Sequence, residues 1–138
     1  MFFRCRRLSL VCAATFAALL VPGCGDRRAR AEETLGEVGA SQLRSDAALL
    51  YKGAFATPGA DFVLVKSSQW PASFHRFQPI RVGAFRDGIS LTLLTSSGTE
   101  AGLYIVPQSM DQPPSKSRGG TFEPIGEGVY WYSFGPRK

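Results

Sequence analysis

The sequence IRVGAFRDGISLTLLTSSGTEAGLYIV, residues 80–106, decides the expected fold. Apolar residues alternate along the runs 80–86, 89–95 and 100–106, which is the pattern of strands with one buried face. Asp87-Gly88 separates the first two runs and predicts a two-residue hairpin turn with positive φ at both positions. Ser96-Ser97-Gly98 predicts the next turn. Because the connections are this short, the three runs predict an antiparallel meander.

Further elements are expected on both sides of this meander. Residues 61–66 form a β-favouring apolar run, which predicts a central strand buried on both faces. Ser41 as an N-cap and Gly53 as a stop predict a short helix over 42–52. Strands are expected at 121–125 and 129–134, and irregular chain at 70–79 and 108–120. The predicted fold is α+β and β-rich, an antiparallel meander sheet of about five or six strands with one short N-terminal helix.

The distribution of charge and cysteine excludes several classes of protein. The formal net charge of the 138 residues is +5, but Arg4, Arg6 and Arg7 precede residue 24, and the remainder carries 13 basic and 11 acidic residues. This surplus of two is too small for a nucleic-acid-binding face. All three cysteines lie within residues 1–24, so neither a disulfide scaffold nor a Cys/His zinc site is expected. We predict no cofactor and no metal.

The N-terminus has the zones of an export signal. A basic segment precedes the apolar run 8–21, which is shorter than the roughly 20 residues that span a bilayer. The following Val21-Pro22-Gly23-Cys24 resembles the lipobox of bacterial lipoproteins, although Pro22 stands where a small residue is usual. The resemblance implies that residues 1–23 are a cleaved signal peptide and that Cys24 carries lipid, including a palmitate-type chain. It also implies a place in the cell envelope, on the periplasmic side of the inner or outer membrane.

The expected domain organisation follows from that N-terminus. Residues 24–40 are rich in charge, Ala and Gly, and we predict a flexible tether there. Residues 41–138 are expected to form a single β-rich extracytoplasmic domain. The alternative is an ordinary signal peptidase that cuts after Ala29-Arg30-Ala31 and releases a soluble secreted protein beginning at Glu32.

The ionisable residues do not form a recognisable catalytic motif. His75 is the only histidine, and its neighbours Phe74, Arg76 and Phe77 favour packing over catalysis. The carboxylates of the folded part are dispersed, and no nucleophile motif occurs. We therefore predict a non-enzymatic protein, with a small envelope hydrolase that uses His75 as the alternative.

The aromatic strand 129–134 supplies the candidate binding residues. If Val129 and Trp131 pack inward, then Tyr130, Tyr132 and Phe134 are either exposed or covered by a loop or helix. In the exposed case the same three side chains would form a recognition patch together with Trp70, which an envelope protein partner could bind. Both alternatives remain open from the sequence.

A second resemblance covers residues 85–134. The segment 85–107, which ends in Gly102-Leu103-Tyr104-Ile105-Val106-Pro107, and the later segment 128–132 are similar to extracytoplasmic domains of transmembrane anti-sigma regulators. The resemblance implies a shared binding or sensing module. The sequence carries neither the zinc-binding anti-sigma domain nor the spanning helix of that family, so direct regulation of a sigma factor is not implied. The expected function is that of a membrane-anchored lipoprotein with a binding, sensing or structural domain.

Overall fold

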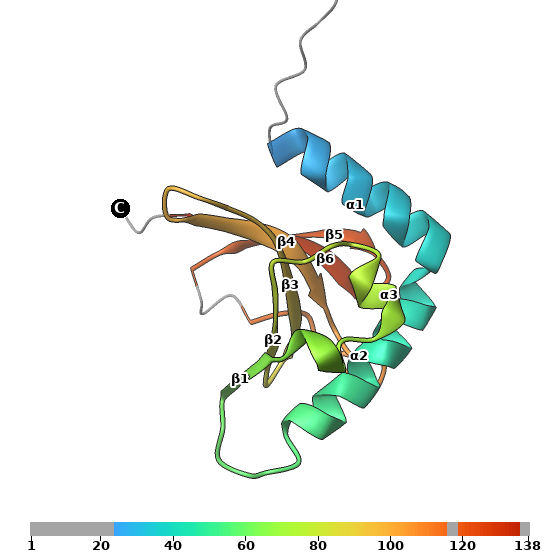
Figure 1. The fold of residues 1–138 in the computed structure, drawn as a ribbon, viewed down its shortest axis with the longest axis vertical. Coiled ribbons are helices and arrows are strands. Elements are labelled where there is room, and N and C mark those ends of the chain that lie inside the picture. Colours follow the sequence, from blue (N-terminus) through green and yellow to red (C-terminus); the bar gives the residue numbers. More distant parts are fainter. Residues whose placement is uncertain (1–23, 116–118, 136–138) are drawn as a thin grey trace, which may run out of the picture.

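The computed structural model describes residues 24–115 and 119–135, and the predicted signal peptide 1–23 lies outside them. A six-stranded antiparallel sheet carries helices on one of its faces (Figure 1). The helices are α1 (Cys24–Val38), α2 (Ala40–Ala54) and α3 (Ala72–His75), with a 3-10 turn, η1 (Ser67–Gln69). The strands are β1 (Phe62–Val65), β2 (Arg81–Phe85), β3 (Gly88–Ser96), β4 (Thr99–Ile105), β5 (Thr121–Gly126) and β6 (Val129–Phe134). The prediction of a β-rich α+β fold is confirmed.

The strand order is β1-β2-β3-β4-β6-β5. The first four strands form the predicted meander, but β6 pairs with β4, and β5 lies beyond it at the edge. The meander prediction is therefore wrong for the last two strands. The segment between β4 and β5 is long enough for the chain to pass the position that β6 occupies, whereas tight turns join β2 to β3 and β3 to β4.

The prediction of one helix and a flexible tether is also wrong, because residues 24–38 form α1. Ala31 and Leu35 lie one turn apart on the same face of this helix, and both are buried against the core. Gly39, with a φ of 87°, separates α1 from α2. The predicted helix over 42–52 is confirmed and extends to Ala40–Ala54, and Gly39 rather than Ser41 occupies its N-cap position. A narrow apolar stripe thus packs α1 against the core, although the average composition of α1 resembles that of a linker.

Two local predictions fail for geometric reasons. The run 61–66 is not a central strand, because β1 is the first strand of the sheet and both Phe62 and Leu64 are exposed. Asp87-Gly88 is not a turn with positive φ, because Gly88 already pairs with Phe85 and neither residue has a positive φ. The turn residues with positive φ are instead Ser97, at 44°, and Gly98, at 83°, between β3 and β4.

The two faces of the sheet differ in what covers them. The helix-covered face holds the core, in which Leu91, Leu103 and Val129 of neighbouring strands are fully buried beneath α1 and α2. Trp131 also packs there, which confirms the inward direction expected for it and for Val129. We call the opposite side of the sheet the open face, because no helix lies on it (Figure 1). Among the described helices, none has the length and apolarity that crossing a membrane requires.

The packing of α1 predicts the effect of truncating its buried side chain. Leu35→Ala removes a buried side chain that only a folded helix could bury, so we expect a loss of about 2–3 kcal/mol in the free energy of unfolding, measured with urea. Glu33→Ala, an exposed position on the same helix, serves as the control and should change stability by less than about 0.5 kcal/mol. Equal, small effects of the two substitutions would contradict the packed helix and support a tether.

Candidate functional site

The open face contains a groove of about 500 Å³. Its apolar wall consists of Phe62 and Leu64 of β1, Phe85 of β2 and Phe134 of β6. Three strands separate β1 from β6 in the sheet, so the sheet curls strongly enough to bring Phe62 and Phe134 to one groove. The groove is therefore a product of sheet curvature and is mostly apolar.

Glycines on the open face make room for aromatic rings from neighbouring strands. A Cβ at Gly83 would lie 2.6 Å from the ring of Phe62, and one at Gly88 would lie 2.4 Å from the ring of Tyr104. Both rings thus lie across the strand beside them, although Phe62 remains 49% exposed. Tyr104 is fully buried in this way, although no helix covers it. The open face covers part of its own apolar surface by this packing.

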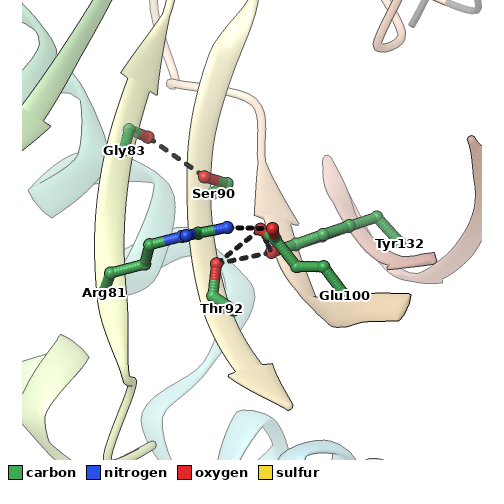
Figure 2. Close-up of polar contacts among 6 residues, drawn as sticks. All are labelled: Arg81, Gly83, Ser90, Thr92, Glu100 and Tyr132. Carbon is green, nitrogen blue, oxygen red and sulfur yellow. Dashed lines mark hydrogen bonds and ion pairs between the residues drawn. The ribbon is translucent and has the colours of Figure 1, made fainter. Parts of the chain in front are cut away.

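Polar side chains from four adjacent strands meet beside the groove (Figure 2). The hydroxyl oxygens of Thr92 in β3 and Tyr132 in β6 lie 2.8 Å apart across β4. The residue between them in the register is Gly102, which leaves the path between the two hydroxyls free of a side chain. Glu100 Oε1 accepts from Thr92 at 2.7 Å and from Tyr132 at 2.9 Å, and its Oε2 pairs with Arg81. We call Arg81, Thr92, Glu100 and Tyr132 the polar cluster.

The electrostatics of the polar cluster favour structure over reactivity. Burial raises the pKa of Tyr132 well above its ordinary value, and the neighbouring Glu100 carboxylate raises this pKa further. The phenol is therefore held in its neutral, hydrogen-bonding form and is a poor nucleophile. Glu100 in turn has both oxygens engaged by three side chains of this cluster. Among the described residues, every buried side-chain nitrogen or oxygen has a hydrogen-bond partner.

The predicted binding residues do not form one surface. Tyr132 is fully buried, whereas Tyr130 and Phe134 are partly buried on the same open face. Trp70 lies just after β1 and η1, where its indole donates to Val65 O at 3.0 Å and its ring packs against the core. The structure thus separates Trp70 from the aromatics of β6. Of the predicted patch, Phe134 alone contributes to the groove wall.

The other candidate residues from the sequence, Cys24 and His75, lie at the ends of helices. Cys24 is the first residue of α1. His75 ends α3 and is exposed, with its ring 5.4 Å from the ring of Trp70. The nearby Ser73 donates to Asp46 at 2.6 Å instead of contacting this histidine. The structure therefore does not bring His75 to a serine–carboxylate pair in the part of the chain that it describes.

Sequence reasoning missed Arg81, Thr92 and Glu100. The strand alternation already placed Ile89 and Leu91 on one face, so Thr92 had to face the opposite side together with Ser90. That signal was available, but the cross-strand register that joins Thr92 to Glu100 and Tyr132 was not. No group of three or more His, Cys, Asp or Glu side chains in the described ranges could hold a metal ion.

Comparison with known proteins found no relative of this chain. No family model matches the sequence, no curated protein matches it, and no solved structure matches the fold. The conclusions about the site therefore depend on the geometry of this chain.

The raised pKa of Tyr132 predicts a loss of stability at alkaline pH. Above about pH 10 the phenol ionises in the unfolded chain but stays protonated in the folded one, so the unfolded state is favoured by up to about 1.4 kcal/mol per pH unit. Below about pH 10 the phenol is protonated in both the folded and the unfolded state, so the stability contributed by the folded environment of Tyr132 is fully present. Unfolding measured in urea at several pH values should show that Tyr132→Phe, which lacks the ionising group, loses less stability than the wild type as the pH rises.

The control for this prediction is Thr92→Val, which removes a hydrogen bond from the same cluster but keeps the phenol. Its alkaline loss should match that of the wild type, while at neutral pH both variants should lose about 1 kcal/mol. The same alkaline slope in Tyr132→Phe and in the wild type would mean that the phenol is not buried as described.

Proposed function

We propose that this protein is a membrane-anchored envelope lipoprotein whose domain binds a partner and catalyses no reaction. The observation that carries the proposal is the groove on the open face. It offers an apolar wall, and its two charged residues, Arg81 and Glu100, are paired with each other. Such a groove suits an apolar group of an envelope protein, while it provides no unengaged acid, base or nucleophile.

The helical start of the domain supports anchoring at a fixed orientation. Since α1 begins at Cys24, lipid on that residue would hold the domain close to the membrane without a flexible connection. Arg27 and Arg30 are exposed in the first half of α1, within reach of lipid headgroups. Each could contribute on the order of 1 kcal/mol at an anionic surface.

Lipid attachment is tested by substitution of the modified cysteine. Cys24→Ser should move the protein from the membrane fraction to the soluble fraction, because the thiol that carries the lipid is lost. Cys12→Ser, within the apolar run of the predicted signal peptide, is the matched control and should stay membrane-bound. Mass spectrometry of the wild type should find a mature chain that begins at an acylated Cys24. A chain that begins at Glu32, or retains Met1 without acyl mass, would contradict the proposal.

Binding at the groove is tested by a photoreactive phenylalanine in intact cells. At Phe62, which is 49% exposed and lines the groove, the probe should give a covalent adduct with an envelope protein. At Phe55, an aromatic residue after α2 that lies outside the groove, the adduct should be absent. No adduct at Phe62, or the same adduct at both positions, would exclude the groove as the binding surface.

A further inference from the structure

Two small residues form the floor of the groove on the open face. Gly83 of β2 and Ser90 of β3 are partners in the strand register, and both line the groove. Larger side chains surround this floor, among them Phe62 and Leu64 of β1 and Phe85 of β2. A depression therefore forms where two adjacent strands both carry a small residue on the same face. Its volume of about 500 Å³ lies within the range of ligand pockets.

The hydroxyl of Ser90 has acceptor capacity that the protein leaves unused. Ser90 is 5% exposed, and its hydroxyl donates to Gly83 O at 3.4 Å. This distance exceeds the roughly 2.5–3.0 Å of a well-formed O–H···O hydrogen bond. Among the described residues, none donates a hydrogen bond to the Ser90 hydroxyl. A nearly buried hydroxyl thus lies in a mostly apolar groove with its acceptor sites open, which a ligand N–H could fill.

Arg81 supplies the complementary capacity beside the groove. Its Nη2 pairs with Glu100 Oε2, and the side chain stays 50% exposed (Figure 2). A guanidinium carries several N–H donors in a fixed plane, and one carboxylate oxygen does not engage all of them. Within residues 24–115 and 119–135, the Arg81 guanidinium has no second acceptor. Donors therefore remain available for a ligand carbonyl.

The charges that line the groove balance each other. Arg81 and Glu100 are its ionisable lining residues, and they form an ion pair. A carboxylate or an ammonium would therefore enter this mostly apolar site without a counter-ion of its own, and its desolvation would be costly. A neutral polar group that both donates and accepts hydrogen bonds meets no such cost. The groove thus has the chemistry to receive an amide.

We propose that the groove binds an internal segment of an extended peptide, with one large apolar side chain on the aromatic wall. The adjoining amide donates its N–H to Ser90 Oγ and accepts at its carbonyl from Arg81. These two residues lie on the same face of neighbouring strands, in rows two residues or about 7 Å apart. One amide that is hydrogen-bonded at both ends can bridge such a separation. The inference rests on the proposed function, because it names the chemistry that the binding groove selects.

Three derivatives of phenylalanine test this selection on the full-length protein in lipid nanodiscs. N-acetylphenylalanine methylamide is neutral, as an internal residue is, whereas N-acetylphenylalanine carries a carboxylate and phenylalanine methylamide carries an ammonium. A para-fluoro label on each ring allows binding to be measured by fluorine NMR line broadening. The neutral derivative should bind about tenfold more tightly than either charged one, because the lining provides no unpaired counter-ion.

Ser90→Ala tests the hydrogen bond to the ligand amide. The substitution sacrifices only a long bond to Gly83, so the fold should be unchanged, while the neutral derivative should bind about fivefold more weakly. Ser96→Ala, at the exposed end of the same strand and outside this groove, is the matched control and should bind as the wild type does. Arg81→Lys keeps a charge beside Glu100 but offers fewer donors, and it should also weaken binding.

The outcomes separate this inference from the proposed function. Equal affinity of the three derivatives, or unchanged binding by Ser90→Ala, would overturn the selection of an amide and leave a groove that binds apolar groups. No binding of any derivative, while the photoreactive probe at Phe62 still captures an envelope protein, would likewise overturn the inference alone. Failure of both the derivatives and the probe at Phe62 would overturn the proposed function as well.

Discussion

One constraint organises this structure, which is that the helices cover only one face of the sheet. The other face must bury its own apolar surface, and it does so with aromatic rings that lie over glycines of neighbouring strands. Tyr104 over Gly88 is the clearest case, since the ring is fully buried and no side chain larger than hydrogen fits beneath it. Phe62 lies over Gly83 in the same way but stays half exposed. The curvature that accompanies this packing forms the groove between the first strand and β6.

The same constraint limits what the open face can do. The charged groups that line its groove are paired with other side chains of the same face, because Glu100 contacts Arg81, Thr92 and Tyr132. What remains available is apolar surface along the groove and at the β1 edge. Surfaces of this kind bind other molecules by shape and apolar contact, and a binding role is the function that we propose. A helix that starts at Cys24 would present these surfaces in a fixed direction relative to the membrane.

The strand pattern made the fold class predictable, because β2 to β4 follow one another through short turns that the sequence marks clearly. It could not place β1 at an edge, since a run of four apolar residues looks the same in a buried and in an exposed strand. α1 was missed because only Ala31 and Leu35 anchor it. At the site, the alternation identified Tyr132 as facing away from the core. Its burial depends on the register with Thr92 and Glu100, which local sequence does not encode.

The most direct test of a self-covering open face is the solvent accessibility of the four tyrosines, measured by NMR with a soluble paramagnetic agent and tyrosine-selective labelling. The structure predicts two classes. Tyr51 and Tyr130 are partly exposed and should relax rapidly, whereas Tyr104 and Tyr132 are fully buried and should be protected. Rapid relaxation of Tyr104 and Tyr132, at the rate of the other two, would show that the open face does not bury its own rings.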